Sequence, residues 1–483
     1  MGDKFGAGLQ PYLPAPSPLR SATSRHILHV IFNRGYSLSI EQMIERNGHQ
    51  KGREVEVSGC LQVRSLGESN TPFWGNSMQP GRIHVEITSE NEELTAATSL
   101  ERTDEQVITI KTPFALDWWN QEGRAPHVTI NITVFTPFRG CIDVLALKVT
   151  NLDVSLHIGL NMYAVDTTVI TTASGNVHVP FPRGEVDQQN WPPILKSRQI
   201  FIYTISGNIV GWLPLHHLLK IQSASGNISL DLDLKSTYWN STVHANLSVE
   251  TISGNIDIKT RSILYDRIGS RIAKKEPPAR DYVVELTSVS GIIDAHVVMA
   301  SRGIFRSEVG DLRLQLLPML LGSRDDGVSH LETATTRGRT TVFMLEPLHC
   351  NAPVADDAAS IMACFELANT IRSPSSNLAG LQSIHRSISG SIMVLYPQSW
   401  TGEFSAETWG KLTVTGPSGT ITRSNTGGPT VVEGLMGEGT SSLRMHNNSG
   451  DLALHVGEPQ GSSGASTVRT RSHSGDGLVN EAL

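Results

Sequence analysis

Hydrophobic and polar residues alternate in short runs along most of the chain. Clear examples lie at residues 54–57, 61–63, 83–87, 107–110 and 128–134, where every second side chain is apolar. A period of two is that of a β-strand with one face buried and the other exposed to solvent. The alternation therefore predicts an all-β protein.

The tripeptide Ser-Gly-Asn recurs ahead of such strands and is the most informative feature of the sequence. Copies stand at residues 174–176, 206–208, 225–227 and 253–255, each followed by an alternating run. A tight turn that leads into a strand, repeated many times, is typical of repeat architectures. The chain is therefore predicted to form a single-chain β-solenoid, with β-helix-like strand–turn repeats.

Each residue type of the tripeptide suits a sharp turn. Glycine adopts positive φ at no steric cost, and serine and asparagine side chains satisfy backbone groups of the turn. If successive turns stack, their asparagines would form a ladder, and this turn role is favoured over a ligand role. The predicted structural turn residues, degenerate copies included, are Gly175, Asn176, Gly207, Asn208, Gly226, Asn227, Gly254, Asn255, Gly291, Gly390 and Gly450.

The repeats are interrupted and flanked by segments of different composition. Ser39 as cap, Gln42 three residues later and the Asn47-Gly48 stop predict one short N-terminal helix. A second helix is expected at residues 355–370. The predicted segments are a disordered tail (1–35), the helix with initial β-strands (36–150), the Ser-Gly-Asn repeats (151–318), an irregular or helical insert (319–380), C-terminal β-repeats (381–456) and a disordered tail (457–483).

Composition and charge narrow the range of partners. The chain has 483 residues, a formal net charge of -7 and a pI of about 6.2, which argues against nucleic acid or an anionic membrane as the main partner. No apolar run is long enough to span a bilayer, so no transmembrane segment is predicted. The N-terminus lacks the apolar region of a leader peptide, and taken alone this predicts a cytoplasmic protein.

Cysteines and glycosylation sequons depend on the compartment. None of the four cysteines forms a CxxC pair, and no metal site is predicted. Cys350 and Cys364 would pair in an oxidising compartment or remain two free thiols. Sequons, in about the number that chance gives, mark possible glycosylation only if the protein is secreted; they begin at Asn131, Asn227, Asn240, Asn246 and Asn447.

Enzyme motifs give little support for catalysis. The sequence has no GxSxG, no P-loop and no complete dinucleotide-binding loop, so no cofactor is predicted. Asp231 and Asp233 share one strand face, and Asp257 follows in the next repeat. Acidic pairs on such a face are used by polysaccharide-active β-helix enzymes, but a solvated strand face is the favoured interpretation.

The turn pattern SGN-[IV]-x-[VIL], the stretch at residues 137–153 and the later segment LYPQSWTGEFSAETWGKLTV (395–414) resemble the putative-adhesin family of β-strand repeat proteins. The resemblance covers roughly residues 80–456, with a gap at 319–380. The family includes bacterial surface proteins and many fungal relatives without an established function. It implies a single-sheet or β-helical repeat fold and a role at the cell surface or after secretion. It supplies no catalytic residues.

Three functions are compatible with this pattern. The favoured one is a non-catalytic, adhesin-like protein that binds a cell-wall glycan or a surface protein through many weak contacts along an extended face. The first alternative is a polysaccharide-active enzyme that uses the acidic residues named above. The second is an intracellular interaction scaffold.

Overall fold

The computed structural model describes most of the chain, with gaps. The described residues are 21–46, 52–66, 79–103, 105–119, 124–137, 140–157, 160, 162–180, 195–236, 244–260, 277–321, 328–350, 378, 380–416, 419–425, 428–457 and 466–470.

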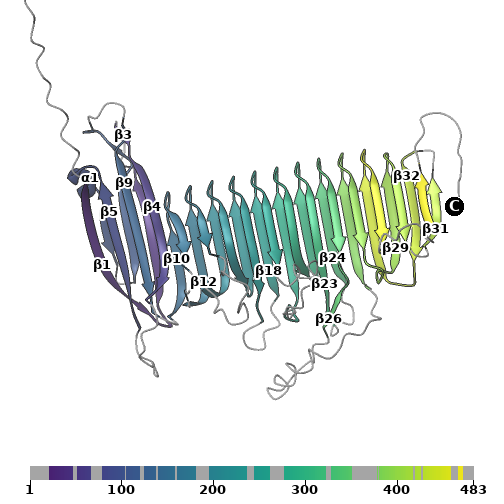
Figure 1. Ribbon diagram of the computed structural model, residues 1–483, viewed down its shortest axis with the longest axis horizontal. Helices are drawn as coiled ribbons and strands as arrows, with labels where there is room; N and C mark the ends of the chain where they lie inside the picture. Colours follow the sequence, from purple (N-terminus) through teal and green to yellow (C-terminus); the bar gives the residue numbers. More distant parts are fainter. Residues whose placement is uncertain are drawn as a thin grey trace, which may run out of the picture.

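The described residues form two large β-sheets, so the prediction of an all-β chain is confirmed (Figure 1). Sheet A contains β1 (Ala22–Phe32), β4 (Glu56–Ser65), β5 (Gln79–Ser89), β9 (His127–Thr136), β11 (Asp153–Leu156), β13 (Val177–Val179), β15 (Ile209–Leu215), β17 (Ile228–Leu234), β19 (Ile256–Thr260), β21 (Ile293–Met299), β23 (Leu312–Leu321), β25 (Thr340–Met344), β26 (Leu348–Cys350), β28 (Ile392–Tyr396), β30 (Leu412–Gly416), β34 (Leu452–Val456) and β35 (Ser466–Thr470).

Sheet B lies against sheet A along the length of the molecule. It contains β2 (Ser37–Glu45), β6 (Ser99–Arg102), β7 (Val107–Pro113), β10 (Cys141–Lys148), β12 (Met162–Thr172), β14 (Leu195–Thr204), β16 (Leu218–Ser223), β18 (Ala245–Thr251), β20 (Tyr282–Ser288), β22 (Arg302–Ser307), β24 (Ser329–Thr335), β27 (Leu381–Ser387), β29 (Gly402–Thr408), β31 (Gly419–Asn425), β32 (Thr430–Met436) and β33 (Ser441–Asn447). A separate two-stranded sheet joins β3 (Arg53–Glu54) to β8 (Ala115–Leu116).

Successive strands in the central part of the chain alternate between the two sheets. A strand of sheet B, a turn and the following strand of sheet A make one repeat, here called a rung; β14 and β15 form such a rung. Neighbouring rungs pair in parallel in both sheets, as β14 does with β16 and β15 with β17. Figure 1 shows the short turns gathered along one edge of this stack.

Alternating side chains fill the space between the sheets. In β17, Ile228, Leu230 and Leu232 are buried, whereas the residues between them are half-buried on the outer face. The same alternation in the other strands produces one continuous apolar core. The outer faces therefore carry every second residue of each strand, in rows that cross the sheets.

The predicted N-terminal helix is wrong. Residues Ser37–Glu45 form β2, because Leu38 and Ile40 alternate with less buried neighbours and are both buried in the core. Gln42 also points inward, and its side-chain oxygen accepts hydrogen bonds from the backbone N–H groups of Thr150 (2.8 Å) and Asn151 (3.1 Å).

The first strand also corrects the predicted N-terminal tail, since β1 lies within residues 1–35 and pairs antiparallel with β5. The described helix is α1 (Glu92–Ala97), which contacts both strands. Its N-cap is Asn91, whose side chain accepts a hydrogen bond from the N–H of Glu93 (3.0 Å). Leu94 of α1 is fully buried, so this helix covers the end of the core.

Two further segment predictions need correction. The predicted insert at residues 319–380 contains β24, β25 and β26, which continue the parallel sheets; the helix expected at 355–370 lies outside the described residues. The predicted C-terminal tail contains β35, which pairs antiparallel with β30. Alternating apolar positions therefore extend the sheets beyond the clear Ser-Gly-Asn copies.

The order of the rungs departs from chain order near the C-terminus. The rung of β33 and β34 lies between the rung of β27 and β28 and the rung of β29 and β30, and it pairs in parallel with both. β32 then pairs antiparallel with β29, and β31 with β32. An inserted rung and antiparallel strands thus terminate the parallel stack.

Candidate functional site

The Ser-Gly-Asn turns stack on one another, but their glycines are needed for a reason other than the predicted one. The φ angles of Gly207, Gly226 and Gly254 lie outside the left-handed range. A Cβ added to Gly254 would instead stand 2.0 Å from the carbonyl oxygen of Gly226, on the neighbouring rung. Glycine is therefore required because the backbones of successive turns approach each other too closely for any side chain.

The asparagines form a ladder that joins successive rungs. The backbone N–H of Asn227 donates to the side-chain oxygen of Asn208 (2.9 Å), and that of Asn255 donates to the side-chain oxygen of Asn227 (2.9 Å). Asp153 begins the ladder by accepting from the N–H of Asn176 (2.7 Å). Each asparagine side chain thus stabilises the turn of the next rung.

The serines and a buried hydroxyl complete the turn. Ser253 Oγ donates to the carbonyl oxygen of Ala224 on the preceding rung (3.3 Å). Thr251, three residues before Gly254, accepts a hydrogen bond from the glycine N–H (3.0 Å). The repeat is therefore Ser/Thr-x-Ser-Gly-Asn. The role of its first position becomes clear only from the geometry of the turn.

Removal of one ladder oxygen should weaken the junction between two rungs. We expect Asn227→Ala to lower the free energy of unfolding by about 1 kcal/mol, because the N–H of Asn255 loses its acceptor. Asn227→Asp is the matched control: it keeps an oxygen in place, as Asp311 does for the N–H of Arg339 (2.9 Å). Urea unfolding and amide exchange at Asn255 measure the effect, and equal loss in both variants would contradict it.

The predicted acidic face lies on the outer surface of sheet A and is interleaved with lysines. Asp231 stands opposite Lys259 in the register of β17 and β19. Lys259 Nζ lies 2.8 Å from Asp257 Oδ2, and this hydrogen bond raises the pKa of the lysine. Asp233 forms an ion pair with Lys235. The structure thus brings the three carboxylates onto neighbouring rungs, interleaved with two lysines.

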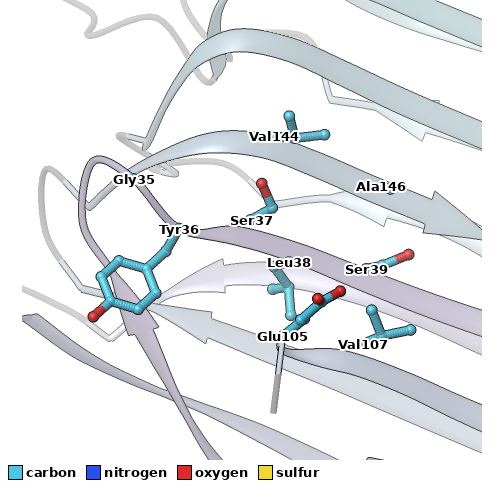
Figure 2. Close-up of a pocket in the computed structure, with 9 residues that line it drawn as sticks. All are labelled: Gly35, Tyr36, Ser37, Leu38, Ser39, Glu105, Val107, Val144 and Ala146. Carbon is cyan, nitrogen blue, oxygen red and sulfur yellow. The ribbon is translucent and has the colours of Figure 1, made fainter. Parts of the chain in front are cut away.

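A shallow hollow of about 400 Å³ lies on the outer face of sheet B near its N-terminal end (Figure 2). Its floor crosses three strands, with Ala146 on β10, Ser39 on β2 and Val107 on β7 side by side. Figure 2 shows Glu105, ahead of β7, beside this floor, and Tyr36 just before β2 with its ring pointing away from the floor. Small, mostly apolar residues with a few polar groups at the margin are typical of a ligand-binding surface.

Gln106 is a buried residue next to the hollow, and its side chain joins β1 to β2. It has a positive φ of 60°, rare for a residue other than glycine, and it is buried. Its side-chain amide accepts from the N–H of Ile31 (2.5 Å) and donates to the carbonyl oxygens of Ile31 and Ser37 (both 3.2 Å). Gln106 therefore ties the end of β1 to the start of β2. Such backbone strain persists where its surroundings enforce it, often at functional sites.

The floor of the hollow continues across the sheet as one row of side chains. Ala146 neighbours Val169 on β12, and Val169 neighbours Phe201 on β14. Phe201 and Tyr203 stack with ring centroids 6.3 Å apart and an angle of 12° between their planes. We call this surface, Val107, Ser39, Ala146, Val169, Phe201 and Tyr203, the sheet B strip. The sequence reasoning missed it, although alternating aromatic residues at 201 and 203 were a visible signal.

The sequons occupy different environments. Asn447 is buried, its side-chain nitrogen donates to the carbonyl oxygen of Gly390 (2.5 Å), and its oxygen accepts from the N–H of Gly450 (3.0 Å). A glycan on Asn447 is therefore incompatible with this fold, and the residue takes the place that Ser or Thr holds in other turns. Asn131 and Asn246 are half-buried on outer faces and Asn227 is exposed, whereas Asn240 lies outside the described residues.

Cysteine, metal and membrane features can be placed only in part. Cys60 and Cys141 are free thiols, while Cys364 lies outside the described residues, so its pairing with Cys350 stays a prediction. Within the described ranges, no three His, Cys, Asp or Glu side chains gather as metal ligands. No helix in that part of the chain has the length and apolarity to cross a membrane.

Comparisons with known proteins give little beyond these observations. No protein-family model matches the sequence, and no curated protein matches it. The chain is similar to a putative cell adhesion protein from Clostridium sporogenes ATCC 15579 (11% identity, 50% of this chain and 100% of that one, TM-score 0.19). It is also similar to a putative adhesin from Parabacteroides merdae ATCC 43184 (8% identity, 68% and 96%, TM-score 0.17). Both TM-scores are too low to identify a fold or a function.

Proposed function

We propose that this protein is a β-solenoid that acts as a non-catalytic, adhesin-like scaffold and binds an extended cell-wall glycan. The observation that carries the proposal is the long run of parallel rungs, with strands about 4.8 Å apart. A repeating surface of this kind presents equivalent positions at a spacing close to one sugar residue of an extended polysaccharide. Many weak contacts along such a face add up to useful avidity.

The charged surface supports a binding role over catalysis. Two lysines lie among the acidic residues of sheet A, Lys259 beside Asp257 and Lys235 beside Asp233. An inverting glycosidase requires a carboxylic acid and a carboxylate that face each other across a bound sugar. The interleaved lysines instead favour a solvated face of mixed charge.

One sedimentation experiment distinguishes the binding function from the catalytic one. The full chain is mixed with insoluble chitin, cellulose, β-glucan or peptidoglycan, and the bound fraction and released sugar ends are measured. We expect binding to at least one of these polymers, no release of sugar ends, and unchanged binding by Asp231→Asn. Absence of binding to every polymer would contradict the proposal. Sugar release that disappears in Asp231→Asn would instead establish the enzyme.

A further inference from the structure

We infer that the sheet B strip is the glycan-binding surface and that it selects neutral, extended oligosaccharides. This inference rests on the proposed function and adds the site and the class of ligand. The hollow at Ser39 and Ala146 would hold one sugar residue. The stacked rings of Phe201 and Tyr203 would hold another, further along the same ligand.

The spacing of the strip fits a ligand that crosses the strands. Ala146 on β10 and Phe201 on β14 are two strands apart in one row, which is about 10 Å. That separation matches two residues of an extended pyranose chain. Short side chains occupy the middle of the strip, at Ser39, Ala146 and Val169. A flat ligand can therefore lie directly on the sheet.

The aromatic pair supplies the apolar contact. Phe201 and Tyr203 are both half-buried, which leaves part of each ring open to solvent. Their planes lie within 12° of parallel, with ring centroids 6.3 Å apart. Sugar rings have one face of C–H groups, and aromatic side chains offer large apolar area together with a polar tip on tyrosine.

The polar groups at the hollow supply orientation. Ser37 and Glu105 are exposed at its margin, and Ser39 and Tyr36 are half-buried beside them. Hydroxyl and carboxylate oxygens at these positions accept hydrogen bonds from sugar hydroxyls. Gln106, whose φ is positive, follows Glu105 directly in the chain.

Charge at the hollow end of the strip favours a neutral ligand there, whereas at the other end Lys220 on β16 neighbours Phe201. The cation that flanks the floor, Lys148 on β10, is hydrogen-bonded to Glu41 on β2 (3.0 Å), and this contact lowers the pKa of Glu41. Glu105 adds negative charge at the hollow itself. An anionic polymer such as a polyuronate would meet Glu105 without a matching cation in the hollow, whereas neutral sugars avoid this repulsion.

The test measures binding of soluble hexasaccharides to the full chain by calorimetry. The probes are neutral glucose, mannose and N-acetylglucosamine hexasaccharides, and a hexauronate of the same length. We expect at least one neutral probe to bind, with affinity at least about tenfold above that for the hexauronate. Phe201→Ala and Tyr203→Ala should each weaken binding about tenfold or more. Glu105→Gln should raise the affinity for the hexauronate.

The matched control is Phe343→Ala, which removes an exposed aromatic ring from the outer face of sheet A. Its affinity should stay within about twofold of the unchanged protein. Unchanged binding by both strip variants, while the protein still sediments with a wall polymer, would overturn this inference and leave the proposed function standing. Preference for the hexauronate would overturn it too. Failure to bind both wall polymers and soluble probes would contradict the proposed function itself.

Discussion

Replacement of Gly254 by alanine is expected to lower the free energy of unfolding by about 3 kcal/mol. The added Cβ would lie 2.0 Å from the carbonyl oxygen of Gly226 and 2.7 Å from its carbonyl carbon. Both are backbone atoms held by parallel strands on either side of the turn, so they cannot move away without breaking hydrogen bonds between rungs. Urea unfolding of the full chain measures the change.

Gly428→Ala is the control for this substitution. A Cβ at Gly428 meets no atom within 4 Å, and its φ lies outside the left-handed range. Its stability should therefore stay within about 0.5 kcal/mol of the unchanged protein. If Gly254→Ala were equally mild, the turns would be further apart than the structure has them.

Acidification should destabilise the protein through two buried histidines. His385 is fully buried, with its ring nitrogens 2.8 Å from Thr333 Oγ1 and 3.2 Å from Tyr396 Oη. Burial lowers the pKa of His385 to about 3, and burial together with Lys235 lowers that of His216 to about 3. In the unfolded chain both groups have a pKa of about 6.5, so the unfolded state takes up protons first.

Proton linkage gives the direction and size of this loss of stability. Above pH 6.5 both histidines are neutral in either state, and stability does not depend on them. As the pH falls from 6.5 towards 3, each lowers the free energy of unfolding by about 1.4 kcal/mol per pH unit. At pH 5 the two together account for about 4 kcal/mol. Urea unfolding at pH 7 and pH 5 measures this loss.

His385→Gln isolates one of the two contributions. Glutamine does not titrate, so the variant should lose about 2 kcal/mol less than the unchanged protein between pH 7 and pH 5. The control is the comparison of both proteins at pH 7, where proton uptake by His385 contributes almost nothing to the difference between them. An identical slope for His385→Gln would mean that His385 is not buried as a neutral group.

The strands could be predicted from the sequence because apolar and polar residues alternate within each one. Residues 228–234 alternate strictly, and β17 follows them. The error at Ser39 arose because Ser, Gln and Asn-Gly at helix-capping positions also suit a strand with its turn. Burial of Leu38 and Ile40 in the core favours the strand over the helix. Local capping chemistry was outweighed by packing against the core.

The sheet B strip could not be predicted, because it depends on which strands become neighbours. Val107, Ser39 and Ala146 are far apart in the sequence and lie side by side only through the register of β7, β2 and β10. The turn glycines were identified correctly but for another reason. Their close contacts run between rungs, and a single repeat does not contain that information.

The inserted rung of β33 and β34 has a consequence for how the chain is assembled during synthesis. Residues 402–416 emerge from the ribosome before residues 441–456, yet their strands pair in parallel with the later ones on the side that faces the rest of the stack. They have no described parallel partner until that later segment exists. Growth by simple addition of rungs, which suits the stack from β10 and β11 to β27 and β28, therefore stops after β28, and the final strands must dock together once residue 456 has been made.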